Sequence, residues 1–152
     1  MVFKFNTAKA VSYANNYANK SNPFYKTFLD GEDCNFVSQC LLAGSENVSD
    51  KKEWFYVDEK NYSSSWVDQN DLFEYLISAQ KGPFGRVVNG NNVMVGDIVF
   101  VSDGEQKEVG IVTKIIGNET FFVVKNKIFE EKNIDKDACF HTKFLHILGV
   151  KK

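Results

Sequence analysis

The stretch GEDCNFVSQCLLAG, residues 31–44, predicts the central helix of this protein. Asp33 is a good N-cap, because its carboxylate can accept a hydrogen bond from an unpaired amide of the first helical turn. The apolar residues that follow are spaced to form one buried stripe, made of Phe36, Val37, Cys40 and Leu41. Gly44 ends the helix, since glycine readily adopts the conformation found just after a helix C-terminus.

Two more helices are predicted on either side of this one. Asn6 or Thr7 caps a helix that runs to about Lys20, and Asn22-Pro23 stops it because the residue before a proline avoids the helical conformation. Its predicted buried face contains Ala8, Val11, Ala14 (or Asn15) and Ala18. Asp68 or Asn70 caps the other helix, which Gly82-Pro83 terminates. Its predicted apolar positions are Leu72, Phe73, Leu76 and Ile77.

The second half of the chain predicts strands. Turn signals separate four apolar runs, at residues 98–101, 109–116, 120–124 and 140–148, and Gly117-Asn118 is a two-residue hairpin signal. Consecutive short strands indicate an antiparallel meander, because parallel strands need long crossover connections. Helices first and strands second is the α+β pattern. We therefore expect one domain over residues 1–152, with N-terminal helices packed on a four- to five-stranded antiparallel sheet.

The charge balance excludes several classes of protein. Lys and Arg total 18, Asp and Glu total 20, and the formal net charge is −2, which argues against a nucleic-acid-binding protein and a polybasic membrane anchor. No apolar run approaches the ~18 residues of a membrane-spanning helix. The N-terminal residues MVFKFNTAKA lack the apolar segment of a signal peptide, so we expect either a cytosolic protein or a chain whose leader has been removed.

Three cysteines, Cys34, Cys40 and Cys139, cannot all pair within the chain. They show no CxxC spacing, so a zinc ribbon is excluded, and we expect neither a metal nor another cofactor. Cys34 lies at a predicted helix start, where unpaired amides can favour a thiolate and stabilise an oxyanion. The alternative is that Cys34 only packs, as free cysteines usually do; Cys40 and Cys139 are interpreted as structural.

Four segments together resemble one known family. GEDCNFVSQCLLAG is similar to GGDCTNFVSQCLYAGG, the signature of the bacterial putative amidase domain, which is related to the NlpC/P60 and CHAP cysteine hydrolases of the papain-like group. AKAVSYANNYANKSNPFYKTF (residues 8–28), YSSSW (62–66) and VGDIVF (95–100) resemble further segments of the family in the same order. The resemblance implies a papain-like fold, hydrolysis of cell-wall peptide amides with Cys34 as nucleophile, and an extracellular or cell-wall location.

The chain departs from this family pattern in two ways. Glu108 stands where the family has its catalytic histidine, and a carboxylate with a pKa near ~4 is a weak base for a thiol with a pKa near ~8.5. Cys34 also directly precedes Asn35, whereas one residue separates the two in the family signature. If NFVSQ keeps its register, Asp33 takes the nucleophile position and Cys34 turns about 100° away. If Cys34 keeps its place, the helix must absorb a one-residue deletion.

A replacement base would have to come from His141 or His146, which lie five residues apart on one predicted strand and so point to opposite faces. His141 is the better candidate, because it lies on the more polar face. The alternative is an exposed or backbone-bonded strand histidine.

Several residues are candidates for ligand binding. Asp33 and Asn35 flank Cys34, and Trp54, Tyr56 and Trp66 cluster in the irregular middle of the chain. The aromatic residues could line a groove for a sugar or peptide, or form a hydrophobic plug between helices and sheet. We favour the plug for Trp66 and leave Trp54 and Tyr56 open.

Two functional hypotheses follow. The protein is either an amidase or cysteine peptidase, impaired by the loss of its histidine, or a non-catalytic module that binds a cell-wall fragment or a protein partner.

Overall fold

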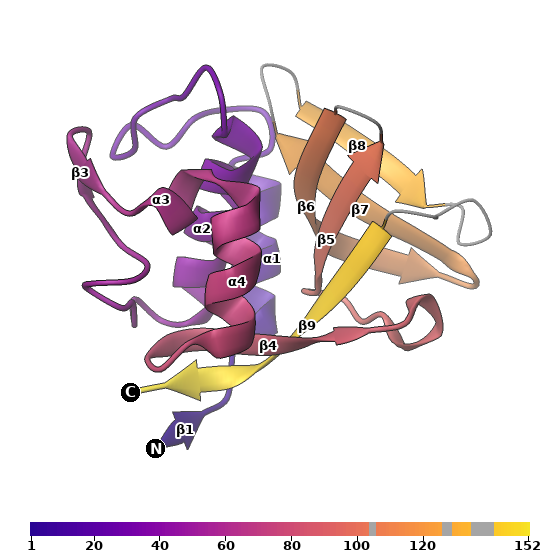
Figure 1. The fold of residues 1–152 in the computed structure, drawn as a ribbon. Helices are drawn as coiled ribbons and strands as arrows, with labels where there is room; N and C mark the ends of the chain where they lie inside the picture. The colour runs from indigo at the N-terminus through magenta and orange to yellow at the C-terminus, as the bar shows by residue number, and fades with distance from the viewer. Residues whose placement is uncertain (104–105, 126–128, 135–141) are drawn as a thin grey trace.

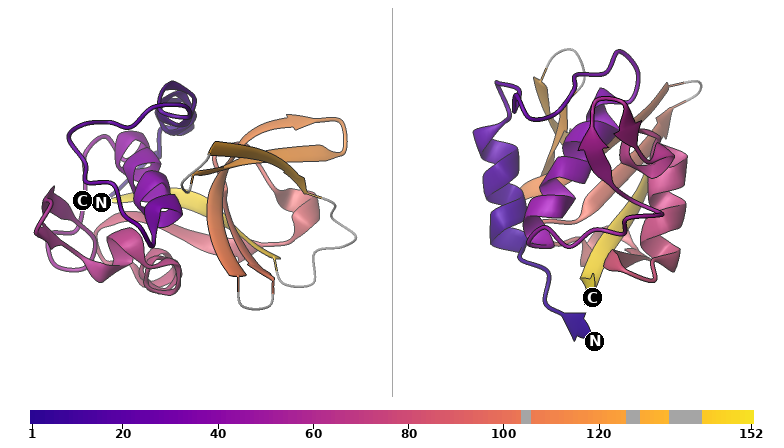
Figure 2. Two further views of the ribbon diagram at one scale, coloured as in Figure 1. Left: turned by 90° about the horizontal axis from the view of Figure 1, so that it is seen from above. Right: turned by 90° about the vertical axis from the view of Figure 1, so that its left-hand side faces the viewer.

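The computed structural model describes residues 1–103, 106–125, 129–134 and 142–152, and it has an α+β fold in which helices pack against one side of a curved antiparallel sheet (Figure 1). The helices are α1 (Thr7–Asn16), α2 (Glu32–Gly44), α3 (Ser64–Val67) and α4 (Gln69–Ser78), with a short 3-10 helix η1 at Gly90–Asn92. Helix α2 lies between α1 and α4 and packs on the sheet through β6 and β7 (Figure 2). The predicted α+β class, with helices packed on an antiparallel sheet, is therefore confirmed.

The sheet has seven described strands, more than the four or five that the sequence predicts. They are β1 (Val2–Phe3), β4 (Gly82–Val88), β5 (Ile98–Asp103), β6 (Gln106–Ile116), β7 (Glu119–Lys125), β8 (Phe129–Ile134) and β9 (Thr142–Lys151). The order is β1-β9-β5-β6-β7-β8, with β4 also paired to β9, and every pairing is antiparallel. A separate hairpin joins β2 (Tyr56–Asp58) to β3 (Asn61–Tyr62).

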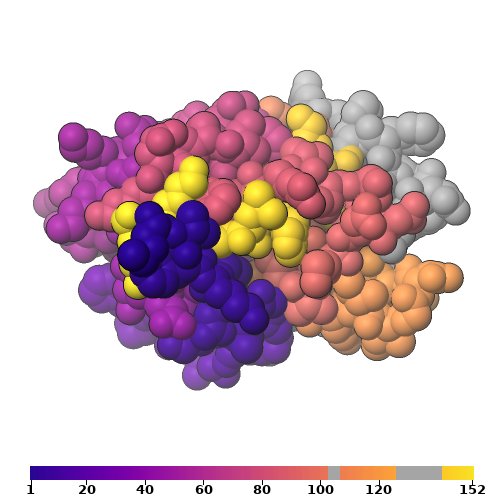
Figure 3. Space-filling model, turned by 90° about the horizontal axis from the view of Figure 1, so that it is seen from below, coloured from indigo at the N-terminus to yellow at the C-terminus, as the bar shows by residue number. Residues whose placement is uncertain are grey.

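The long C-terminal strand β9 organises the sheet. Its first residues, 142–145, pair with β5, most of its length, residues 144–151, pairs with β4, and its last residues pair with β1. The N-terminal residues consequently lie directly against β9 (Figure 3). Strand β4 begins at Gly82-Pro83, which we expected only to stop a helix. Among the described strands β4 pairs with β9 alone, and such an edge position tolerates a proline that has no N–H to donate.

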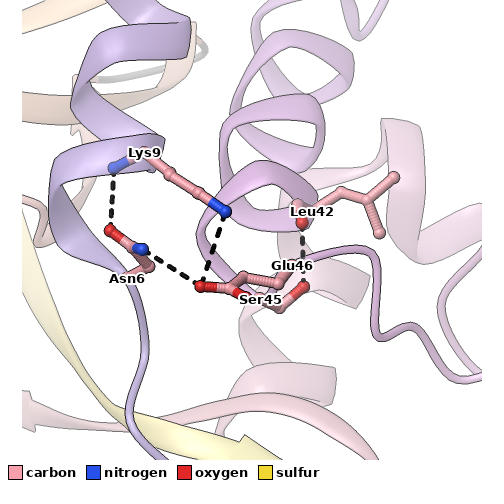
Figure 4. A network of polar contacts seen from close by, with 5 residues as sticks. All are labelled: Asn6, Lys9, Leu42, Ser45 and Glu46. Carbon is pink, nitrogen blue, oxygen red and sulfur yellow. Dashed lines mark hydrogen bonds and ion pairs between the residues drawn. The ribbon is translucent and has the colours of Figure 1, made fainter.

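Helix α1 is capped by Asn6 as predicted, but it is shorter than predicted and presents a partly different face to the core. The Oδ1 atom of Asn6 accepts a hydrogen bond from the backbone N–H of Lys9, and both residues contact Glu46 beyond the end of α2 (Figure 4). The helix ends at Asn16 instead of about Lys20, and the Tyr17 and Lys20 carbonyls accept hydrogen bonds from the Lys125 ammonium of β7.

The buried face of α1 is confirmed in part. Ala14 and Ala18 are buried as predicted and Val11 is half-buried, but Ala8 is exposed and Ala10, which was not predicted, is buried beside Tyr13. In α4, Leu72 and Leu76 are buried as predicted, but Ile77 is exposed.

Helix α2 is buried on every side of its first ten residues, Glu32 to Leu41. The apolar stripe of Phe36, Val37, Cys40 and Leu41 is confirmed. The surrounding helices and the sheet cover the remaining faces, so polar side chains of α2 are also enclosed. These enclosed polar groups form the candidate site.

Candidate functional site

The first turn of α2 starts at Gly31, not at the predicted cap Asp33. Gly31 is the N-cap residue and has a left-handed backbone with φ of 84°. A Cβ atom at this position would collide with the backbone carbonyl oxygen of Val67, so the close approach of α3 requires glycine. Asp33 is therefore the second helical residue, and its side chain is free to contact the sheet.

Asp33 faces strand β6. Its Oδ2 atom accepts a hydrogen bond from the backbone N–H of Val109 at 2.9 Å, and Glu108 is the next residue of that strand toward its start. Burial raises the pKa of the Asp33 carboxyl, and the negative charge of Glu108 adds to that effect. The structure thus brings Asp33 close to Glu108, the strand position at which the resemblance implies a histidine.

Cys34 points elsewhere. It is 1% exposed, and its Sγ atom lies 3.9 Å from the carbonyl oxygen of Ser65 in α3, to which the thiol donates. Burial raises the pKa of the Cys34 thiol well above its ordinary value, and the negative charges of Asp33 and Asp68 raise it further. A reactive cysteine needs the opposite setting, one that is accessible and positively charged.

The NFVSQ segment holds two tryptophans in the core. Asn35 Oδ1 accepts a hydrogen bond from Trp66 Nε1 at 2.9 Å, and Asn35 Nδ2 donates to the Lys26 carbonyl. Ser38 Oγ accepts from Trp54 Nε1 at 3.2 Å and donates to the Trp66 carbonyl. Because both indole rings are fully buried, Trp54 joins Trp66 in the plug, and neither ring is open to a ligand.

Tyr56 is the one candidate aromatic residue with an accessible surface. It is half-buried at the start of the β2–β3 hairpin, and its hydroxyl oxygen accepts a hydrogen bond from the backbone N–H of Lys26 at 2.8 Å. A groove of about 460 Å³ opens beside it.

A second polar pair, which the sequence interpretation missed, lies on the other face of the sheet. His146 Nδ1 and Asp97 Oδ1 are 2.7 Å apart, and Asp97 Oδ2 accepts from the Met94 N–H. The neighbours of His146 in β9, Leu145 and Ile147, belong to the core on the helix side, so His146 points away from α2. The available sequence signal was Asp97, which directly precedes β5, a strand that pairs with the histidine-bearing strand β9.

Two residues singled out in the sequence, His141 and Cys139, lie outside the part of the chain that the structure describes. In the described ranges no three His, Cys, Asp or Glu side chains gather as a metal would require. Over the same ranges, no helix has the length and apolar character needed to cross a bilayer.

Two further pockets flank the start of α4. One of about 600 Å³ has Ser63, Ser65 and Tyr75 in its wall, and another of about 280 Å³ lies between α4 and the sheet, with Phe73 and Lys107 in its wall.

Two substitutions at Asp33 should separate its charge from its hydrogen bond. Asp33→Asn keeps an acceptor for the Val109 N–H and removes the buried charge, so stability at pH 7 should equal or exceed that of the wild type. Asp33→Ala leaves that N–H without a partner and should cost about 1–3 kcal/mol. Urea unfolding from pH 3 to pH 8 measures both variants.

The raised pKa of Asp33 predicts how the stability effect of Asp33→Asn changes with pH. Because the pKa of Asp33 is raised on folding from 3.8, its stabilising contribution is complete below that value and is lost as the pH rises through the folded pKa. The advantage of Asp33→Asn should therefore grow with pH over this range. A loss of stability equal to that of Asp33→Ala would contradict the assignment.

Comparisons with known proteins show the family to which this chain belongs. A family model described as "Putative amidase domain" matches residues 4–139. The uncharacterized protein YhbB of Bacillus subtilis is 32% identical over 118 residues, covering 72% of this chain and 37% of YhbB. The uncharacterized protein YjcM of the same organism is 36% identical over 90 residues, covering 59% of this chain and 20% of YjcM.

The chain thus spans little more than a third of one relative and a fifth of the other. No solved structure gives a significant match. The family model covers most of the chain, including α2 and most of the sheet, and on this ground the protein belongs to the putative amidase domain family.

Proposed function

We propose that this chain is one papain-like domain that keeps the amidase fold and binds its ligand without hydrolysing it through Cys34. The ligand class that the family resemblance suggests is a cell-wall fragment, with a protein partner as the alternative. The relatives are much longer than this chain, so the proposal concerns the domain and not the whole of a longer protein.

One observation carries the proposal: Asp33, and not Cys34, faces the strand that holds Glu108. Helix α2 is continuous from Glu32 to Gly44, which favours the alternative in which NFVSQ keeps its register and the cysteine turns away. The tryptophan hydrogen bonds of Asn35 and Ser38 support that register, since shifting it would leave buried indole N–H groups without partners.

The electrostatics support the same conclusion. Thiol hydrolysis needs a thiolate and a nearby base that can accept its proton. Burial raises the pKa of the Cys34 thiol, and the surrounding charges are carboxylates. A carboxylate at position 108 opposes a nearby thiolate instead of stabilising one.

The test is a hydrolysis assay on purified bacterial peptidoglycan, in which the release of new primary amines measures the rate. The wild type, Cys34→Ala, Glu108→His and His141→Ala should all give the background rate, while an active cysteine amidase serves as positive control. Turnover by the wild type that disappears in Cys34→Ala would overturn the proposal. If that turnover were also lost in His141→Ala or in Glu108→His, the substituted residue would be identified as the base.

A further inference from the structure

A groove of about 460 Å³ separates residues 23–27 from the β2–β3 hairpin. Both segments lie at the helical end of the molecule, far from β7 and β8 (Figure 1). Its aromatic lining consists of Phe24 and Tyr25 on one side and Tyr56 on the hairpin side, where Asp58 and Glu59 also lie. We infer that this groove binds a saccharide, an inference that rests on the proposal that the domain binds without cleaving.

The aromatic wall is held in place by the core. The Tyr25 ring stacks on the buried Trp66 ring with centroids 5.9 Å apart, and the Tyr56 ring stacks on Tyr62 at 6.0 Å. The hydrogen bond from the Lys26 N–H to the Tyr56 hydroxyl ties one side of the groove to the other. A wall fixed in this way loses little conformational entropy when a ligand binds.

Phe24 supplies the open surface. Phe24 is 66% exposed although its ring meets that of Tyr25 edge-on at 5.0 Å, so much of this residue remains in water at the groove. Exposed aromatic rings of this kind stack on flat apolar ligand surfaces. The C–H face of a sugar ring is such a surface, and it leaves the hydroxyl groups pointing outward at the ring edge.

The polar lining suits those hydroxyl groups. The carboxylates of Asp58 and Glu59 are acceptors, and the Tyr56 O–H can still donate, because its oxygen uses only a lone pair on the Lys26 N–H. The charged lining consists of one lysine, Lys26, and two carboxylates, so its formal charge is 1 − 2 = −1. Such a weak net charge favours a neutral, hydroxyl-rich ligand over a strongly basic peptide.

The test is a titration of the ¹⁵N-labelled chain with triacetylchitotriose and with cellotriose, observed by amide NMR. At least one sugar should shift amides of residues 24–27 and 56–59. Phe24→Ala should weaken binding about tenfold or more, and Asp58→Asn with Glu59→Gln should weaken it several-fold. Leu29→Ala is the matched control, because Leu29 is 86% exposed in the same segment and does not line the groove.

Three outcomes would overturn the inference: no shift with either sugar, shifts confined to another surface, or equal weakening by Phe24→Ala and Leu29→Ala. Salt-sensitive binding of a lysine-rich peptide here, without sugar binding, would show a peptide site instead. Hydrolysis through Cys34 would refute the proposed function whether or not sugars bind. Absence of sugar binding with an inert Cys34 would refute this inference alone.

Discussion

Replacing Trp66 with alanine should lower the free energy of unfolding by about 3–5 kcal/mol, the usual cost of deleting a buried aromatic ring. Trp66 is fully buried, and its ring centroid lies 4.9 Å from that of Trp54 and 5.9 Å from that of Tyr25. Its removal also leaves the Asn35 amide oxygen without its indole donor. Because domains of this size are stable by about 5–15 kcal/mol, this loss is a large part of the total.

Urea unfolding monitored by circular dichroism measures this loss. Ile77→Ala serves as the control, because Ile77 is a large apolar residue that is 44% exposed and should cost far less. Trp66→Phe should fall between the two, since it keeps an aromatic ring and loses the hydrogen bond to Asn35. A cost below about 1 kcal/mol for Trp66→Ala would show that the aromatic plug does not stabilise the fold.

Gly31→Ala should be the second most damaging change, at about 2–4 kcal/mol. A left-handed backbone costs a non-glycine residue about 1–2 kcal/mol, and the new Cβ would also collide with the Val67 carbonyl. The collision can be relieved only by moving α3 away from the start of α2. The Ser65 carbonyl that covers Cys34 belongs to that same helix.

Gly117→Ala provides the matched comparison for this change. Gly117 has φ of 60°, but a Cβ atom added there would meet no other atom within 4 Å, so only the conformational cost of about 1 kcal/mol applies. Thermal and urea unfolding of the two variants should therefore differ clearly. Equal costs would mean that α3 does not press against Gly31 in solution.

Local patterns in the sequence predict the strongest elements of the fold. The stripe from Phe36 to Leu41, the cap at Asn6 and the strands at 98–101, 109–116 and 120–124 all appear in the structure. Strands β1 and β4 could not be found in this way, because both pair with β9, which is distant in the sequence, whereas β8 pairs with the neighbouring β7 but has the mostly polar sequence FEEKNI. In β4, pairing with the C-terminal strand overrides the stop signal of Gly82-Pro83.

The candidate site was likewise only partly predictable from local sequence patterns. The spacing of Cys34 and Asn35 posed two alternatives, and the register of α2 was decided by contacts that local spacing does not reveal. The thiol environment depends on Ser65, which is 31 residues away, and the buried amide of Asn35 depends on Trp66. The sequence also left open whether Trp54 is buried, because its buried indole N–H donates to the hydroxyl of Ser38, 16 residues away.

The most direct measurement of the central claim is the alkylation rate of Cys34 by iodoacetamide in the folded protein at pH 7, followed by residue-resolved mass spectrometry. A buried thiol with a raised pKa should react at least about 100-fold more slowly than free cysteine, and its rate should recover in denaturant. Cys40, which is also buried, is the internal control. Native Cys34 reacting faster than free cysteine while Cys40 stays protected would contradict the account, because it would reveal an activated nucleophile.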